Sequence, residues 1–502
     1  MATQEAIKNP PPTALQRHIG MLRVFLPQLP LIVRVALAHA LNLSETAPYL
    51  DLRSAVIVAV LRSMCAPGPS KPISVSKIQK LSVRDAGVKG RIWVSTYASP
   101  VPPEDGAREA LGRAMASLMP RRDYPEQDGI PDIMRRVPEC TPVEAEWTGY
   151  RAGAGRDDPP PAGMSERSKY DALMKECGQP TTILYLHGGA CFLLDPASHR
   201  PTTKKLAKLT SGRCYSVRYR LAPKHPFPAA LLDAFVSYLT LLYPPPDAYH
   251  EPVRPEHIVF AGDSAGGNLS MSLLQLLLEL RRLGQPVSWH GEERRVPLPA
   301  AVACNSPWMD VTSSSPAFYG DAPYVFDYIP KPAHLARNAV MPCDIWPANP
   351  PREHLYVTAD LADHPLTSPI TAGNWDGAPP VYMCTGWELL AWEVKVAAKR
   401  LAVQGVPVVF EEYEAMPHCF AMVLTETSAS RRCFAAWSSF IRAAVANPIS
   451  IAPRATYIKA KTLDEEPLRF DNLGDVSLGE IRDQVKRKAN DLSSPMWRVA
   501  KL

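Results

Sequence analysis

The feature that most constrains the fold of this chain is a serine flanked by glycines, between an apolar run and a leucine-rich stretch. Residues 260–267 read Phe-Ala-Gly-Asp-Ser-Ala-Gly-Gly, with Ser264 at the centre of a Gly-x-Ser-x-Gly pentapeptide. The run 258–261 predicts a strand, and the leucine-rich stretch after the pentapeptide predicts a helix. A sharp turn between them strains the serine backbone, and Gly262 and Gly266 omit side chains that would collide. The pattern predicts a nucleophile at Ser264, whereas the pentapeptide alone is also compatible with a glycine-rich surface turn.

A second glycine-rich segment follows an apolar run upstream of this serine. Residues 182–186 predict a strand that leads into His187, Gly188 and Gly189. Fixed backbone N–H groups stabilise the negative charge that develops on a carbonyl oxygen during nucleophilic attack. We therefore expect Gly188, Gly189 and Ala265 to form an oxyanion hole, and we interpret His187 as structural.

A histidine with a suitable position for a general base lies downstream. His418 follows the strand-like run 406–413 and stands in a loop before Phe420. A serine nucleophile needs such a base to take its proton. The alternative interpretation is that His418 is a packing residue beside Phe420.

The third member of a triad should be an acid that orients the imidazole. Glu388 fits this role because it follows the strand-like run 380–384. Asp and Glu can both hold the imidazole tautomer and stabilise the imidazolium. The alternative interpretation of Glu388 is a first-turn helix acid that interacts with the helix dipole, with Glu393 and Asp376 as substitutes for the triad role.

Taken together, these motifs resemble the hormone-sensitive-lipase family of α/β-hydrolases, in which the order is serine, acid, histidine. The resemblance extends over residues roughly 140–445, and the segment 146–151 is similar to fungal members related to sterol-ester deacetylases. It implies hydrolysis of carboxylic esters without a cofactor or a metal. Many relatives carry Asp followed by Pro-Leu where this chain has Glu388-Leu-Leu. The segments that carry the resemblance are His187-Gly-Gly-Ala190, Tyr219-Arg-Leu-Ala-Pro-Lys-His-Pro-Phe-Pro-Ala-Ala230, Gly262-Asp-Ser-Ala-Gly-Gly267, Ser306-Pro-Trp-Met-Asp310 and Met416-Pro-His418.

Strand-like and helical segments alternate along the chain, which predicts an α/β fold with a mainly parallel sheet and helices on both faces. We expect an N-terminal cap and loop-rich region over 1–140, a catalytic domain over 141–450 with a cap insertion at 312–377, and a C-terminal extension over 451–502. The expected strands are 90–94, 182–186, 214–219, 258–261, 300–304, 381–384 and 406–413. Aromatic residues of the insertion are candidates for packing or for lining an apolar pocket: Phe318, Tyr319, Tyr324, Phe326 and Tyr328.

Composition narrows the classes of partner. The 502 residues are 46% hydrophobic, which suffices for a sizeable core. Net charge is only +5, and the basic residues are scattered, so nucleic acid is not an expected partner. The ten cysteines lack metal-ligand spacing, and the first residues lack a secretory signal, so we expect reduced thiols in an intracellular protein.

Two N-terminal apolar segments, 31–43 and 55–61, read as amphipathic helices that are too short to span a bilayer. They would cover the pocket as a lid or rest on a membrane surface as a peripheral contact. We favour the lid, because amphipathic periodicity more often reflects packing within a chain. Deletion of residues 1–60 should then impair activity towards soluble esters.

The chain ends in Ala500-Lys501-Leu502, which resembles the Ser-Lys-Leu peroxisomal address. This ending predicts that a peroxisomal import receptor binds the protein. If no such receptor recognises the tripeptide, we expect a cytoplasmic location.

The combined interpretation is a serine hydrolase that cleaves small apolar carboxylic esters through an acyl-enzyme on Ser264. The same acyl-enzyme is compatible with acyl transfer, or with another biosynthetic tailoring reaction of secondary metabolism. A third alternative is a non-catalytic ligand receptor, which the intact triad disfavours.

Overall fold

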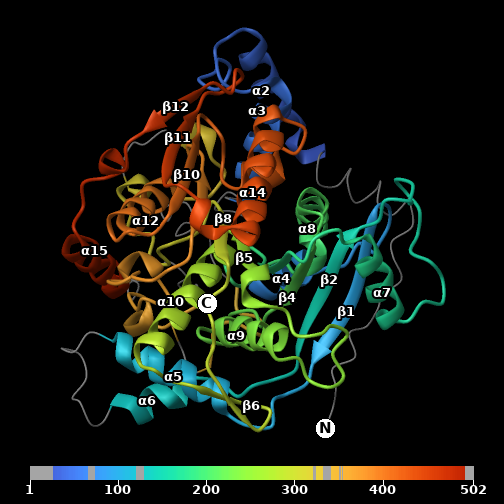
Figure 1. Cartoon of the computed structure of the whole chain (residues 1–502). Helices are drawn as coiled ribbons and strands as arrows, with labels where there is room; N and C mark the ends of the chain where they lie inside the picture. The colour runs from blue at the N-terminus through green and yellow to red at the C-terminus, as the bar shows by residue number, and fades with distance from the viewer. Residues whose placement is uncertain are drawn as a thin grey trace.

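A ten-stranded sheet runs through the molecule in the order β1-β2-β4-β3-β5-β8-β9-β10-β11-β12 (Figure 1). The computed structural model describes residues 26–65, 74–119, 129–319, 324–331, 341–349, 352 and 354–491. The strands of the sheet are β1 (Ile92–Ser99), β2 (Val143–Tyr150), β3 (Thr182–Leu186), β4 (Arg213–Arg218), β5 (Ile258–Asp263), β8 (Ala301–Asn305), β9 (Val381–Thr385), β10 (Val408–Tyr413), β11 (Arg454–Ile458) and β12 (Glu465–Leu468). A separate hairpin pairs β6 (Val287–Trp289) with β7 (Glu292–Arg294).

The centre of the sheet is parallel from β4 to β11, and antiparallel strands lie at both edges. β1 and β2 extend one edge, and β12 closes the other. All residues of β3, β5, β8, β9 and β10 are buried, which explains why the first four strands read as largely apolar runs, whereas β10 also carries Glu411 and Glu412. The predicted α/β fold with a mainly parallel sheet is confirmed.

Helices cover both faces of this sheet. Their bounds are α2 (Leu29–Ala40), α3 (Leu52–Cys65), α4 (Val75–Ser82), α5 (Gly106–Leu118), α6 (Gly129–Arg136), α7 (Glu166–Glu176), α8 (Pro196–Thr210), α9 (Ala229–Leu242), α10 (Ala265–Arg282), α12 (Ala391–Val403), α13 (Phe420–Val423), α14 (Ser428–Ala446) and α15 (Leu478–Asp491).

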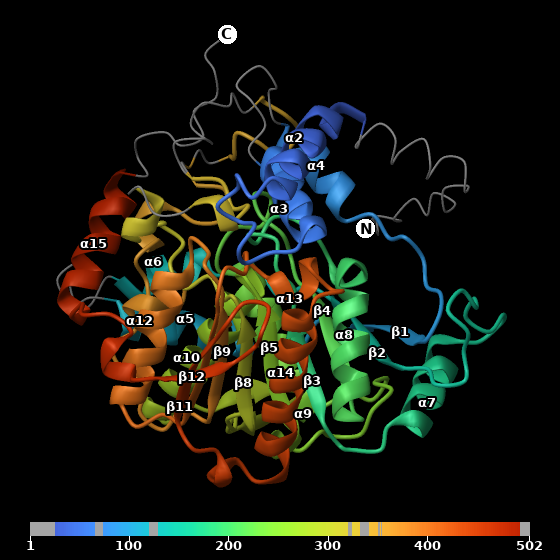
Figure 2. The same cartoon turned by 90° about the horizontal axis from the view of Figure 1, so that it is seen from above.

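Each face of the sheet has its own hydrophobic core, and each core holds a different set of helices. Leu184 and Leu186 of β3 pack in the core that also holds α5, α9, α10 and α12. Ile183 and Tyr185 of the same strand point to the core that holds α8 and α14, which lie in front of the sheet in Figure 2. This alternation along one strand is the two-residue period of a sheet buried on both sides. The helix predicted after Ser264 is α10, and it is buried along nearly its whole length.

The sheet draws strands from all three segments expected from the sequence. β1 lies within 1–140, while β11 and β12 lie beyond residue 450. Of the two expected N-terminal helices, α3 contributes Ala55 and Val58 to the core, whereas α2 has no fully buried residue. Among the helices that the structure describes, none combines the length and the apolar character needed to cross a membrane.

Candidate active site

Ser264 stands at a strained turn between β5 and α10. Its backbone has φ 52° and ψ −118°, a region that L-residues rarely adopt. Hydrogen bonds hold the turn on both sides, because Ser264 N–H donates to Asn305 O at 3.1 Å and Trp308 N–H donates to Ser264 O at 2.9 Å. A Cβ at Gly266 would lie 1.9 Å from Leu186 O, so the helix can approach β3 only with glycine there.

The acid and the histidine of the expected triad lie in contact. Glu388 follows β9 and His418 follows β10, at neighbouring parallel strands. Oε2 of Glu388 lies 3.0 Å from Nδ1 of His418, and both side chains are buried. Thr385 Oγ1 donates to the other carboxylate oxygen at 2.7 Å. Glu388 is therefore positioned to hold the imidazole with its proton on Nδ1.

The two alternative acids lie elsewhere. Glu393 is buried, and its Oε1 accepts the backbone N–H groups of Met309 and Asp310 at 2.7 and 3.3 Å. Burial and the nearby Asp310 carboxylate raise the pKa of Glu393 well above its ordinary value. Asp376 is exposed in a loop. Of these three acids, Glu388 is the one whose carboxylate contacts His418.

The charge around His418 favours its protonated form. Burial alone lowers a histidine pKa, but the Glu388 carboxylate opposes this through its charge and its hydrogen bond, with further contributions from Asp327 and Asp263. The net result is a His418 pKa above its ordinary value. Such a histidine stabilises the imidazolium that forms when a serine gives up its proton.

Nε2 of His418 faces a thiol in this structure. Sγ of Cys419 lies 3.4 Å from Nε2, and within the described residues no hydrogen bond joins Nε2 to the Ser264 hydroxyl. Burial, together with the surrounding carboxylates, raises the pKa of the Cys419 thiol well above its ordinary value. Cys419 is therefore a protonated neighbour of the imidazole. Hydrogen bonds between nucleophile and base are often long or absent in substrate-free enzymes.

The glycine loop after β3 lies against the serine turn. Gly188 N–H donates to Asp263 Oδ1 at 3.2 Å, while Gly189 adopts φ +109°, and a Cβ there would lie 2.3 Å from Leu193 O. Within the described chain, no hydrogen bond occupies the N–H of Gly189 or of Ala265. Of the three N–H groups expected to bind an oxyanion, those of Gly189 and Ala265 are therefore available in the described chain, whereas that of Gly188 already donates to Asp263.

His187 is a buried, neutral side chain. Its ring stacks on Tyr219 with centroids 4.2 Å apart, and Nδ1 lies 2.7 Å from Gly188 O. Burial, with the nearby His199, lowers the pKa of His187 to about 3. Tyr219 OH donates to His187 O at 2.6 Å, so these two residues brace the glycine loop.

A buried ion pair lies beside the nucleophile. Nε2 of His199 is 3.3 Å from the Asp263 carboxylate, and Tyr185 OH donates to Asp263 Oδ1 at 2.7 Å. Burial raises the pKa of Asp263, but the charge and hydrogen bond of His199 outweigh burial and lower it overall. Asp263 thereby stays ionised and accepts the Gly188 N–H, which ties the glycine loop to the serine turn.

Sequence reasoning did not identify Asp327, which connects the two loops that carry Glu388 and His418. Oδ1 of Asp327 accepts the His418 backbone N–H at 3.1 Å, and Oδ2 accepts the Leu389 N–H at 2.8 Å. Asp327 lies in the insertion and belongs to none of the motifs, so motif spacing does not identify it. The available signal was an acid between two aromatic residues, Phe326 and Tyr328, in a segment expected to border the site.

The aromatic residues of the insertion have different surroundings. The Tyr328 ring lies 6.1 Å from the His418 ring, and Phe326 packs edge-on against Tyr49 and Trp387. Phe318 is buried beside Leu389 and Leu390, while Tyr319 is half exposed. The side chain of Tyr324 lies outside the described residues.

Helix α3 reaches the same insertion from the N-terminal part of the chain. Arg62 donates through Nε to Asp327 O at 2.7 Å and through an Nη to Val325 O at 2.5 Å. Tyr49, just before α3, contacts Trp387 with ring centroids 5.3 Å apart. The N-terminal region therefore packs beside the Glu388 and His418 loops.

Within the described residues, no group of histidine, cysteine or acidic side chains is arranged to hold a metal ion. All ten cysteines are free.

Comparison with known proteins gives concordant matches. A family model described as the alpha/beta hydrolase fold matches residues 183–422. The chain is 30% identical over 276 residues to an acetyl-hydrolase of Streptomyces hygroscopicus, covering 52% of this chain and 76% of the relative. It is 28% identical over 353 residues to the esterase LipU of Mycobacterium tuberculosis, covering 66% of this chain and 97% of the relative. The crystal structure of EstE5 aligns with a TM-score of 0.50 at 20% identity, over 78% of this chain and 99% of that one, and supports the fold.

Proposed function

The chain belongs to the hormone-sensitive-lipase type of the α/β-hydrolase family, and from this we propose that it is a serine carboxylic ester hydrolase with Ser264 as nucleophile. The observation that carries the proposal is the buried contact between Glu388 and His418, 3.0 Å long, together with the strained turn that holds Ser264. The names of two relatives, acetyl-hydrolase and esterase, support the same reaction class.

The reaction begins when Ser264 Oγ attacks the ester carbonyl carbon. His418 Nε2 takes the hydroxyl proton, while Glu388 keeps the other ring proton on Nδ1 and stabilises the imidazolium. For this step the serine hydroxyl replaces the Cys419 thiol as the partner of Nε2. His418 then gives its proton to the departing alcohol, which leaves an acyl group on Ser264. Water, activated by His418, releases the carboxylic acid and restores the enzyme.

Backbone donors stabilise the oxyanion of the tetrahedral intermediate. Gly189, in the loop after β3, and Ala265, at the start of α10, supply N–H groups that have no other partner among the described residues. Gly188 contributes only if it exchanges its bond to Asp263 for one to the substrate. Removal of a single oxyanion donor costs about 10²–10³ in kcat in serine proteases, so two free donors account for much of the rate enhancement.

The substrate is a small apolar ester. Two aromatic contacts give His418 apolar surroundings, which supports an apolar substrate: the Tyr328 ring lies 6.1 Å from the His418 ring, and Phe326 packs against Trp387. The segment 146–151 resembles fungal sterol-ester deacetylase relatives, so sterol acetates belong in a substrate panel. Esters from acetyl to long acyl chains, measured with and without added alcohol acceptors, will identify the acyl length and separate hydrolysis from acyl transfer.

Substitution of the nucleophile tests the mechanism. We expect Ser264→Ala to lower kcat by about 10⁴–10⁶-fold, as in other serine triads, and to abolish labelling by a fluorophosphonate probe. Cys419→Ala is the matched control because this thiol occupies the nearest position to Nε2. The control should keep both turnover and labelling. Unchanged turnover in Ser264→Ala, or loss of labelling in Cys419→Ala alone, would refute Ser264 as the nucleophile.

A further inference from the structure

A cavity opens at the end of the sheet opposite to Ser264. It has a volume of about 680 Å³ and lies at the amino-terminal ends of three parallel strands. Gln179 precedes β3, Arg213 begins β4, and His257 precedes β5. Ser264, Glu388 and His418 all follow the carboxyl ends of their strands, so this amino-end pocket is separate from the site described above.

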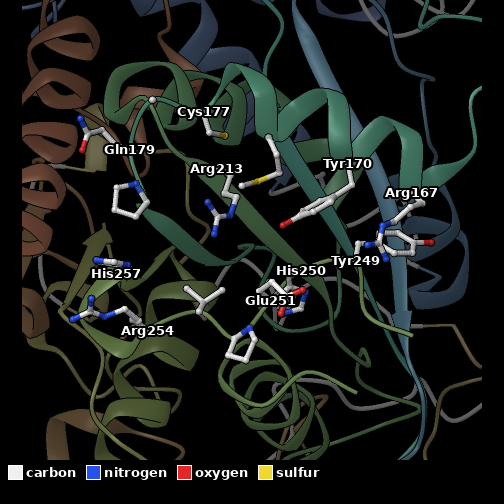
Figure 3. A pocket seen from close by; sticks show the side chains of 15 residues that line it. Arg167, Tyr170, Cys177, Gln179, Arg213, Tyr249, His250, Glu251, Arg254 and His257 are labelled. Atoms are coloured by element: carbon white, nitrogen blue, oxygen red, sulfur yellow. The ribbon is translucent and has the colours of Figure 1, made fainter. Parts of the chain in front are cut away.

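Arg213 is the central feature of the amino-end pocket. It is only 8% exposed, and its Nε has no hydrogen-bond partner among the residues that the structure describes. Its guanidinium lies 5.7 Å from the Trp147 ring, and no acid within the described chain forms an ion pair with it. Figure 3 shows Arg213 directed into the space bordered by Tyr170, His250 and Arg254. A buried cation without a counterion is costly, unlike one that has an anionic partner.

The charges around this arginine do not neutralise it. Burial, and then the nearby Arg213 charge, keep the pKa of His250 at about 4, although a hydrogen bond to Thr240 O favours the protonated form. Burial, with Arg254 and Arg213, also lowers the pKa of His257. Arg254 lies at the exposed rim with Glu256 as its partner. Among the residues that line the pocket, three arginines face one acid, Glu251. Arg167 pairs with Asp171 and Arg254 with Glu256, which leaves Arg213 as the lining arginine without an ion-pair partner in the described chain.

The rest of the amino-end pocket accommodates an apolar body. Tyr170, Met174 and Val253 contribute apolar surface beside Arg213. A neighbouring cavity of about 470 Å³ shares Gln179, Pro180 and His257 with it and adds apolar surface from α14. The space therefore exceeds what an inorganic ion alone would fill.

We propose that the amino-end pocket is a binding site for a small organic anion, a carboxylate or phosphate on an apolar or aromatic body. The anionic oxygens pair with the Arg213 guanidinium, which can donate two parallel hydrogen bonds to either group. Arg254 strengthens binding from the rim through its charge. The apolar body packs on Tyr170 and Met174.

Calorimetric titration of the full chain tests this site. The probes are phenyl phosphate and benzoate, with benzyl alcohol as the uncharged comparison and inorganic phosphate as the anion without an apolar body. We expect both aromatic anions to bind more tightly than benzyl alcohol and inorganic phosphate. Arg213→Gln should weaken anion binding about tenfold or more, and Arg254→Gln about threefold. Titrations in the Ser264→Ala background should give the same affinities, because binding at the amino-end pocket does not involve the nucleophile.

Arg469→Gln is the matched control, since it removes one positive charge from an exposed position far from the pocket. It should bind the probes as the unmodified chain does. The proposal would be overturned if Arg213→Gln and Arg254→Gln both bound the aromatic anions as tightly as the unmodified chain does. It would also be overturned if the unmodified chain showed no saturable binding at millimolar probe concentration. If Arg213→Gln unfolds, as judged by circular dichroism, the exposed Arg254→Gln variant decides between the two outcomes. A loss of affinity that the Ser264→Ala background alone produces would place the anion at the ester site and refute the inference.

Discussion

At the residue scale, the site depends on how one histidine is charged. His418 acts as a base only when neutral, and its raised pKa means that the neutral form predominates at higher pH than for an ordinary histidine. We expect kcat/KM to rise with pH through a midpoint above 6.5, the ordinary value. A pH profile with a soluble ester measures this midpoint. A midpoint at or below the ordinary value would contradict the assigned surroundings of His418.

Glu388→Gln removes the negative charge of the acid and keeps the size of its side chain. The loss of the carboxylate removes the main interaction that raises the His418 pKa, so the midpoint should move to lower pH, and kcat should fall by about 10⁴-fold. Glu393→Gln is the control, because the Gln carbonyl oxygen can still accept the Met309 and Asp310 N–H groups. The control should leave the midpoint in place. A shift of the midpoint in Glu393→Gln but not in Glu388→Gln would reverse the assignment of the acid.

Asp327 allows a second test at the same scale. Asp327→Asn keeps one acceptor oxygen and turns an NH₂ group towards one of the two backbone N–H donors, so one loop loses its anchor. We expect kcat to fall about 10–100-fold with little change in KM, and stability to fall by about 1–3 kcal/mol. The pH midpoint should also decrease, since the Asp327 charge raises the His418 pKa. Asp376→Asn, at an exposed position, should change none of these quantities, and a purely structural role for Asp327 would leave the midpoint unmoved.

At the scale of elements, the N-terminal helices behave differently from each other. α3 is anchored by Arg62 to the insertion, which supports the lid that the sequence favours. α2 instead exposes Leu29, Val33 and Leu37 at helical spacing, which is the arrangement that a peripheral membrane contact requires. Deletion of residues 1–60 would also remove Leu50, Ala55 and Val58 from the core, so it combines loss of the lid with loss of stability.

A single substitution isolates the lid more cleanly. Arg62→Met removes the hydrogen bonds from α3 to Val325 and Asp327 and keeps an unbranched side chain. We expect kcat/KM for soluble esters to fall about fivefold, because about 1 kcal/mol of positioning is lost. Val33→Ser/Leu37→Ser, on the exposed face of α2, should leave soluble-ester kinetics unchanged. Unaltered kinetics in Arg62→Met would argue against the lid, and reduced vesicle binding of the α2 variant would assign α2 to a membrane surface.

The central strands were predictable because they are buried on both faces. β3, β5, β8 and β9 correspond to largely apolar runs in the sequence, and β10 to a run that is apolar apart from Glu411 and Glu412. β12, at the edge, reads Glu-Glu-Pro-Leu and carries no such signal, since its side chains face solvent. The site residues were likewise predictable only where the local sequence carries a pattern. Ser264, Glu388 and His418 have local motifs, whereas Asp327 acts through backbone contacts that only folding brings together.

At the scale of the whole molecule, one sheet unites segments that the sequence separates. β11 pairs with β10, the strand that precedes His418, and Glu414 N–H donates to Ile458 O at 2.9 Å. Removal of residues 451–502 would therefore expose the unpaired edge of β10. We expect such a truncated chain to aggregate, which light scattering during thermal unfolding would measure. A monomeric and fully active 1–450 fragment would show that the extension is dispensable.

The C-terminal tripeptide Ala500-Lys501-Leu502 lies outside the described residues, and we propose that it directs the protein to peroxisomes. The last ten residues fused to a fluorescent reporter should give punctate fluorescence that coincides with a peroxisomal marker. Removal of Leu502 should make the signal diffuse. A diffuse signal from the complete peptide would exclude this address.

Asp327 also limits how this protein can acquire new specificities. The insertion contains the carboxylate that accepts the backbone N–H groups of His418 and Leu389 and so fixes the loops that carry the acid and the histidine. A change in the insertion that admits a bulkier ester and shifts Asp327 would alter proton transfer together with access. Engineering of the insertion should therefore leave the backbone around Asp327 in place, because a shift of this carboxylate also moves the histidine loop.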